Sequence, residues 1–132
     1  MKSGKVYFVE PVYADIESLD PRTRHILSSV DVVLHDSSSP AEILAVVRPS
    51  ARQHNVGEFG TPSGMSPEEI RAQLVTYATQ GFDVVRIDEP GVAGARTRKH
   101  EANVLRLCGI EFEVLSAEAV DRAEARTVAV GV

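Results

Sequence analysis

The sequence has one cysteine, no excess of positive charge and no long apolar run, and each lack excludes a class of protein. Cys108 alone cannot form a disulfide within the chain. A net charge of -5 disfavours binding to nucleic acid, because nucleic-acid binders concentrate positive charge. The first apolar run, residues 6–9, is too short for a signal peptide or a membrane span. We therefore expect a cytoplasmic protein that binds neither nucleic acid nor membrane.

The composition is that of an ordinary globular domain. Hydrophobic residues make up 43% of the 132 residues and charged residues 25%, and this length is close to the common size of a single hydrophobic core. We expect one domain over residues 1–116, followed by a tail or edge strand over residues 117–132.

Short β-branched runs alternate with segments in which apolar residues recur at helical spacing. Strands are predicted over residues 5–9, 31–35, 52–56, 82–87 and 110–115, and helices from residue 21 and over residues 40–47, 67–79 and 99–108. The helix at Pro67 has the best signals, because Ser66 and Glu69 form a capping box and proline stands at the first helical position. Strands separated by helices predict a three-layer α/β domain with a five-stranded, mostly parallel sheet. Ligands of such sheets bind beyond the carboxyl ends of the strands.

Other chemical patterns in the sequence are weak. His35, Asp36 and the serines at 37–39 include the residue types of a catalytic triad, but neighbours on a strand point to opposite faces and no G-x-S-x-G turn occurs. We predict no catalytic residue there, and no metal site, because the acidic residues between positions 15 and 20 match no calcium loop. Cys108 is interpreted as packed on the buried face of a helix.

Residues 91–100 form a basic cluster in a segment predicted to be a loop leading into a helix N-terminus. Arg96, Arg98 and Lys99 could bind a phosphate or carboxylate there, with help from backbone amides and the helix dipole. The segment matches neither the Walker lysine pattern nor the dinucleotide fingerprint. An exposed charged loop and an anion-binding site both remain open.

A series of segments follows one protein family in the same order along the chain. They are residues 4–9, 26–27, 30–36, 42–44, 56–57, 66–70, 84–87 and 109–115. In them the sequence resembles the N-terminal domain of the tetrapyrrole methylases, which include uroporphyrinogen-III C-methyltransferase and the precorrin methylases. The resemblance implies an α/β fold, a pocket for S-adenosylmethionine between two domains, and substrate-binding roles for Asp15 and Asp36.

The first ligand-binding turn of that family differs in this chain. The family has G-A-G-P-G-D, whereas residues 10–15 are E-P-V-Y-A-D. Val12 and Tyr13 would fill space that glycine leaves open, and Glu10 adds negative charge, which repels a polycarboxylate substrate. The sequence therefore predicts a pocket that is smaller and more acidic than that of an active methylase.

Two further contacts of the family are changed. The family's G-G-D-P loop, which helps to hold the cofactor, corresponds to Glu89, Pro90, Gly91 and Val92, and its later P-G pair corresponds to residues 116–117. The leading hypothesis is therefore a degenerate, non-catalytic methyltransferase-like domain, a binding or interaction module that holds no cofactor on its own. One alternative is a methyltransferase component that uses S-adenosylmethionine as a homodimer or with a separately encoded second domain. Another is an anion-binding regulatory domain.

Overall fold

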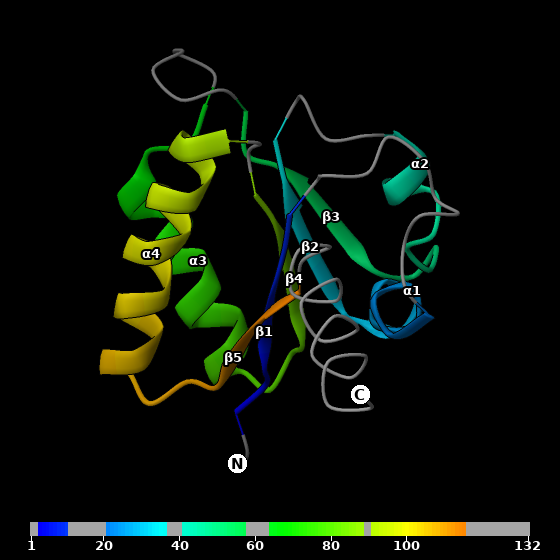
Figure 1. Ribbon diagram of the computed structural model, residues 1–132. Helices are drawn as coiled ribbons and strands as arrows, with labels where there is room; N and C mark the ends of the chain where they lie inside the picture. The colour runs from blue at the N-terminus through cyan, green and yellow to red at the C-terminus, as the bar shows by residue number, and fades with distance from the viewer. Residues whose placement is uncertain (1–2, 11–20, 37–40, 58–63, 89–90, 116–132) are drawn as a thin grey trace, which may run out of the picture.

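Five parallel strands form the central layer of the molecule (Figure 1). The computed structural model describes residues 3–10, 21–36, 41–57, 64–88 and 91–115. The strands are β1 (Val6–Val9), β2 (Val32–His35), β3 (Arg52–Asn55), β4 (Val84–Ile87) and β5 (Phe112–Leu115). They lie in the order β3-β2-β4-β1-β5, and all neighbours pair in parallel. The predicted α/β fold class is confirmed.

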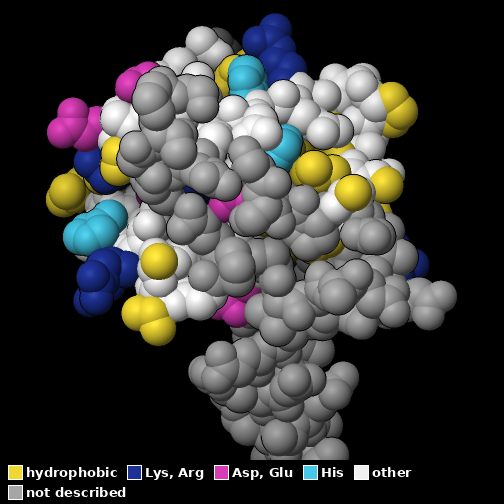
Figure 2. Space-filling model, turned by 90° about the horizontal axis from the view of Figure 1, so that it is seen from above, with side chains coloured by type: hydrophobic (Ala, Val, Ile, Leu, Met, Phe, Trp, Pro, Cys, Tyr) yellow, Lys and Arg dark blue, Asp and Glu magenta, His cyan; other side chains and the backbone are white. Residues whose placement is uncertain are grey.

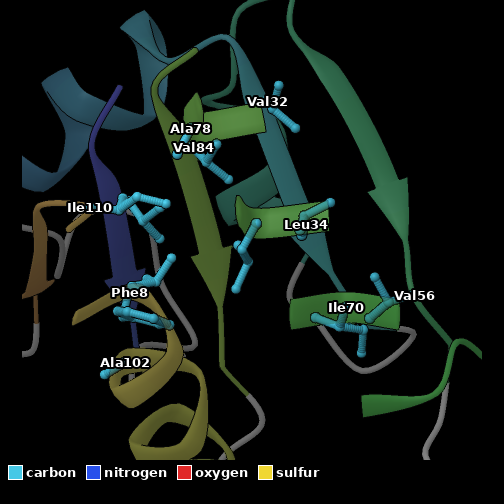
Figure 3. Close-up of a cluster of buried hydrophobic side chains, with 12 residues drawn as sticks. Phe8, Val32, Leu34, Val56, Ile70, Ala78, Val84, Ala102 and Ile110 are labelled. Atoms are coloured by element: carbon cyan, nitrogen blue, oxygen red, sulfur yellow. The ribbon is translucent and has the colours of Figure 1, made fainter. Parts of the chain in front are cut away.

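Helices cover both faces of this sheet (Figure 1). Helices α3 (Pro67–Thr79) and α4 (Gly91–Leu107) pack on one face, and α1 (Pro21–Ser29) and α2 (Ala41–Leu44) pack on the other. Because successive strand residues point to opposite faces, each inner strand contributes to both cores. Figure 3 shows the core beneath α3 and α4, which includes Phe8, Val32, Leu34, Ile70, Ala78, Val84 and Ala102.

Helix α3 begins as the sequence predicts. The Ser66 hydroxyl accepts a hydrogen bond from the Glu69 N–H at 3.1 Å, and the Glu69 carboxylate accepts one from the Ser66 N–H at 3.4 Å. Ile70 and Leu74, which were expected to face the sheet, are buried. The helix stops before Gly81, whose φ of 92° is one that glycine adopts without steric cost.

Replacement of Ser66 by alanine is expected to lower the free energy of unfolding by about 1 kcal/mol, because the Glu69 N–H then loses its acceptor. Urea denaturation followed by circular dichroism measures this change. Ser50→Ala is the matched control, since Ser50 is exposed and precedes β3 rather than a helix. Equal destabilisation in the two variants would contradict the capping role.

Helix α4 is longer than predicted. It starts at Gly91, whereas the sequence predicted a loop up to residue 96 and a helix from Lys99. Glycine lowers helix propensity by about 1 kcal/mol relative to alanine, and two glycines in this segment therefore indicated a loop. In the fold Gly94 is buried and Arg98 forms ion pairs with the end of the sheet, so tertiary contacts stabilise the additional helical turns.

Three smaller predictions also need correction. Helix α2 ends at Leu44 instead of continuing to residue 47, although Val47 is buried as expected. Cys108 is exposed rather than packed in the core, because α4 ends at Leu107 and the chain turns at Gly109, where φ is 71°. Val114 lies in a strand as predicted but is 38% exposed, since β5 is at the edge of the sheet.

Candidate functional site

The carboxyl ends of β1 and β4 lie next to each other at one end of the sheet. Val9 pairs with Ile87 in the parallel register, so Glu10 and Asp88, which follow these residues, are neighbours. The Asp88 N–H donates to the Val9 carbonyl at 2.9 Å and extends the pairing by one bond. Figure 2 looks onto this end of the molecule and shows side chains of both charge signs on the described surface. It is the end at which α/β sheets of this kind bind ligands.

One arginine from α4 joins the two strand ends. Arg98 Nη1 donates to Glu10 Oε1 at 2.8 Å and to Asp88 Oδ2 at 2.9 Å. The side chain of Asp88 is only 3% exposed, and those of Glu10 and Arg98 are 23% and 20% exposed. We call Glu10, Asp88 and Arg98 the Arg98 cluster. The Arg98 guanidinium donates hydrogen bonds to both carboxylates, so these acids neutralise its positive charge inside the domain.

The carboxyl group of Asp88 is the titratable part of this cluster. Burial raises the pKa of Asp88 to about 7, although the hydrogen bond from Arg98 and the positive charges of Arg98 and Arg86 act in the opposite direction. Near neutral pH, Asp88 is therefore present in both protonated and ionised forms. The net charge of the Arg98 cluster changes by one unit in this range.

A second, deeper ion pair also joins β4 to α4. Arg86 Nε donates to Glu101 Oε1 at 3.1 Å, and these side chains are 1% and 2% exposed. Arg86 Nη1 also donates to the Ile87 carbonyl at 3.0 Å. Burial raises the pKa of Glu101, and the charge of Arg86 opposes that rise. The charge on Glu101 thus depends on Arg86.

The two ion pairs place their charges in opposite order between the strand and the helix. Arg86 and Asp88 are two residues apart on β4 and share a face of the sheet, whereas Arg98 and Glu101 are three residues apart on α4 and share a side of the helix. The strand contributes the cation of the inner pair and the anion of the outer pair. A one-turn shift of α4 would bring like charges together, so the two pairs specify the position of the helix on the sheet.

The structure places the predicted anion-binding residues differently from the sequence interpretation. Arg98 is engaged by two carboxylates, while Arg96 and Lys99 are exposed on α4. All three lie inside the helix, because its N-terminus is at Gly91. Glu10, which was expected to add negative charge, pairs with Arg98 in the structure. No local pattern indicates this contact between residues that are 88 positions apart.

Of the other predicted site residues, the structure describes Asp36, Gly91 and Val92. Gly91 and Val92 form the first turn of α4, and the Val92 side chain is 77% exposed. Asp36 follows β2 and is buried, and His35 Nδ1 lies 3.0 Å from the backbone carbonyl oxygen of Asp36. The proposed positions Asp15, Glu89 and Pro90 lie outside the described residues.

The described segments contain neither a cluster suited to a metal ion nor a helix suited to spanning a membrane. No group of three or more His, Cys, Asp or Glu side chains in them is arranged to hold a metal ion. Within the same part of the chain, no helix combines the length and the apolar character needed to cross a membrane.

Known proteins with similar sequences are methyltransferases and related enzymes. No protein-family model matches the chain. A uroporphyrinogen III methyltransferase of Methanosarcina barkeri is 36% identical over 114 residues, which are 85% of this chain and 44% of that protein. The uroporphyrinogen-III C-methyltransferase of Bacillus subtilis is 32% identical over 117 residues, 87% of this chain and 24% of that protein. The chain thus spans less than half the length of these relatives.

Solved structures show the same relationship. The uroporphyrin-III-C-methyltransferase of Thermus thermophilus matches with a TM-score of 0.68 and 34% identity, over 86% of this chain and 47% of that one. A structure of the Thermus thermophilus enzyme complexed with S-adenosylhomocysteine matches with a TM-score of 0.64 and 29% identity, over 85% of this chain and 44% of that one. A cobalt precorrin-4 methyltransferase, at 20% identity and a TM-score of 0.64 over 84% of this chain and 44% of that one, supports the fold alone.

These matches show that the α/β domain is homologous to the tetrapyrrole methylases, as the sequence resemblance implied. Within that family, its relatives are uroporphyrinogen-III methyltransferases and siroheme synthases. The homology covers about 85% of the chain.

Proposed function

We propose that this chain is a non-catalytic member of the tetrapyrrole methyltransferase family that acts as a binding or interaction module. The Arg98 cluster is the observation that supports this proposal. At the end of the sheet where such folds bind ligands, the described polar groups of β1, β4 and α4 bond to one another. A ligand seated against these strand ends would have to displace Arg98 and leave the buried Asp88 without its partner, which costs free energy.

S-adenosylmethionine does not fit the described side chains at this end. Its ammonium and sulfonium groups are cationic and would compete with Arg98 for Glu10 and Asp88. The sequence departures at residues 10–15 and 89–92 act in the same direction, because side chains replace glycines that admit a ligand. We therefore derive no methyl-transfer step for this chain.

The second candidate function is a methyltransferase component that is completed by another polypeptide. It is favoured by the 36% identity to a named methyltransferase of which this chain covers 44%. A second copy of the chain, or a separately encoded domain, would then supply the other wall of the cofactor pocket. S-adenosylmethionine would be the methyl donor in that case. A cytoplasmic location, expected from the sequence, stays a prediction under both candidates.

An anion-binding regulatory role centred on Arg96, Arg98 and Lys99 has less support. Arg98 would have to leave two carboxylates to bind an external anion. Arg96 and Lys99 are exposed and accessible, but separate exposed cations on a helix bind anions weakly in water.

Isothermal titration calorimetry with S-adenosylmethionine and S-adenosylhomocysteine distinguishes the non-catalytic module from a homodimeric methyltransferase. We expect no saturable heat at millimolar ligand, because Arg98 already bonds to the carboxylates of Glu10 and Asp88 at this end of the sheet. The uroporphyrin-III-C-methyltransferase of Thermus thermophilus, solved with S-adenosylhomocysteine, serves as the positive control under the same conditions.

The titration is repeated over a range of protein concentrations, with the oligomeric state followed by size-exclusion chromatography and light scattering. Saturable binding at any concentration would contradict the non-catalytic proposal. If binding arose only in the dimer, the homodimeric methyltransferase would be the function instead.

A further inference from the structure

A polar pocket lies at the amino-terminal end of the sheet, opposite the Arg98 cluster. Its volume is about 340 Å³, which is at the lower end of the range for small-molecule sites. It lies between the start of β3 and the last turns of α3, which ends at the lower edge of the molecule in Figure 1. Its lining residues are Arg52, Ala72, Gln73, Thr76, Tyr77 and Gln80.

One wall of the pocket is fixed by contacts around Tyr77. The Tyr77 hydroxyl and His54 Nε2 are 2.8 Å apart and share a hydrogen bond, and the two ring centroids are 5.7 Å apart. On its other side, the Tyr77 ring meets the edge of Phe82 with a centroid separation of 6.1 Å. Because these contacts hold the aromatic ring between β3 and the end of α3, the wall exists before any ligand binds.

Two lining groups have bonding capacity that the described residues do not use. Gln73 Oε1 is buried and accepts no hydrogen bond from any described group, and a buried acceptor without a donor costs about 1–3 kcal/mol. Arg52 is exposed and forms no ion pair in the described part of the chain. Asp31, whose carbonyl accepts the Arg52 N–H, uses its carboxylate for Arg48 at 2.7 Å and for the Asp83 N–H at 2.9 Å.

These two groups define complementary requirements for a ligand. The Arg52 guanidinium favours a carboxylate or phosphate, with which it can form paired hydrogen bonds. Gln73 Oε1 requires a donor such as a hydroxyl or amino group. The pocket also adjoins the C-terminal end of α3, where the helix dipole is negative and disfavours an anion without an accompanying donor. Among the described residues, no carboxylate side chain lines the pocket to repel an anionic group.

We propose that this pocket binds a small organic carboxylate or phosphate that also carries a hydroxyl or amino donor. Arg52 binds the anionic group, and Gln73, after a side-chain rotation that turns its buried Oε1 towards the pocket, accepts the hydrogen bond from the donor. Thr76 and Gln80 supply further polar contacts along the same side of α3. The inference goes beyond the proposed function and does not depend on it, because no residue of the pocket belongs to the Arg98 cluster.

Two-dimensional NMR of the ¹⁵N-labelled chain tests this site with four probes. Glycerol 3-phosphate and L-serine each combine an anionic group with a donor, whereas sulfate and acetate supply the anionic group alone. We expect saturable shifts of the backbone amides of residues 52–54 and 72–80 with one or both bifunctional probes. Affinity for sulfate or acetate should be about tenfold weaker, the difference that one net hydrogen bond of about 1.4 kcal/mol produces. The probe that binds more tightly identifies the phosphate or the carboxylate as the anionic group.

Two variants and a matched control assign the residues. Arg52→Gln should weaken the bifunctional probe about tenfold or more, because a hydrogen bond to a charged group contributes about 1.5–3 kcal/mol. Arg96→Gln removes the same charge from exposed α4 and should change nothing. Gln73→Met fills similar space without an acceptor and should abolish the preference for the bifunctional probe over its monofunctional counterpart. Absence of saturable shifts with both bifunctional probes, equal affinity for the monofunctional ones, or unchanged binding in Arg52→Gln would each overturn the proposal.

Discussion

Replacement of Arg86 by methionine is expected to lower the free energy of unfolding by about 3–5 kcal/mol, which is typical of breaking a buried ion pair by removing one partner. The variant loses the 3.1 Å bond to Glu101 and the 3.0 Å bond to the Ile87 carbonyl. Glu101, only 2% exposed, then has no cation and must either remain charged in an apolar core or take up a proton. Urea denaturation followed by circular dichroism measures the loss.

The double variant Arg86→Met/Glu101→Leu separates charge from packing. With both charges absent, no unpaired ion remains, and replacement of a buried pair by apolar side chains is often neutral or stabilising. The double variant should therefore recover at least half of the loss, which a double-mutant cycle reports as a coupling energy. Arg96→Met is the control, because Arg96 is exposed on the same helix and its effect should stay within about 0.5 kcal/mol. A double variant no more stable than Arg86→Met would show that packing, not charge, is lost.

Local signals in the sequence were sufficient to predict most of the fold. The apolar run at β4 and the capping box at Ser66 each satisfy a requirement of the element that they belong to, so they could be recognised without knowledge of the neighbours. The order of the strands in space, β3-β2-β4-β1-β5, agrees with the family resemblance but could not be obtained from the local patterns.

The errors concern places where a distant contact decides the structure. Helix α4 extends over a glycine-containing segment because Arg98 binds Glu10, 88 positions away. Cys108 occupies a helical position that would be buried if α4 continued, but the turn at Gly109 leaves it exposed. No property of either residue alone indicates these outcomes, because they depend on the end of the sheet and the end of the helix.

The candidate site was less predictable than the fold for the same reason. The sequence located the right end of the sheet, through Glu10 and the segment after β4, but it treated Glu10 and Arg98 as independent charges. A weak signal for the inner pair was present: β4 is an apolar strand with one arginine, Arg86, and α4 contains one acidic residue, Glu101. A charge inside an apolar strand needs a partner of opposite sign, and Glu101 is the acid that the following helix offers.

A change of pH is expected to produce the second large effect on the stability of the protein. Lowering the pH from about 8 to about 5.5 should stabilise the protein through Asp88 by on the order of 2 kcal/mol, since one pKa unit corresponds to about 1.4 kcal/mol. Burial raises the pKa of Asp88 from 3.8 to about 7, so between these values the folded chain holds a proton that the unfolded chain lacks. Stability then increases as pH falls. Arg98, Arg86, Glu101 and Glu10 are the charged groups near Asp88, and the two arginines limit the rise.

Protonation of Glu113 has the opposite effect on the free energy of unfolding, and it occurs in a lower range of pH. A hydrogen bond from Arg22, with a further one from Lys5, lowers the pKa of Glu113 from 4.5 to about 2. Its stabilisation is therefore complete above about pH 4.5 and is lost as pH falls towards about 2. The stability of the chain should consequently rise on mild acidification and fall again below about pH 4.5.

Asp88→Asn isolates the contribution of Asp88, because an amide resembles the neutral carboxyl group and does not titrate. The free energy of unfolding is measured in urea at several values between about pH 8 and pH 5.5 for both proteins. The variant retains every other titratable group of the wild type, so the difference between the two profiles reports Asp88. We expect that difference to shrink as the pH falls, because wild-type Asp88 becomes neutral. Parallel profiles would mean that Arg98 holds Asp88 ionised throughout this range, and the charge of the Arg98 cluster would then be constant near neutral pH.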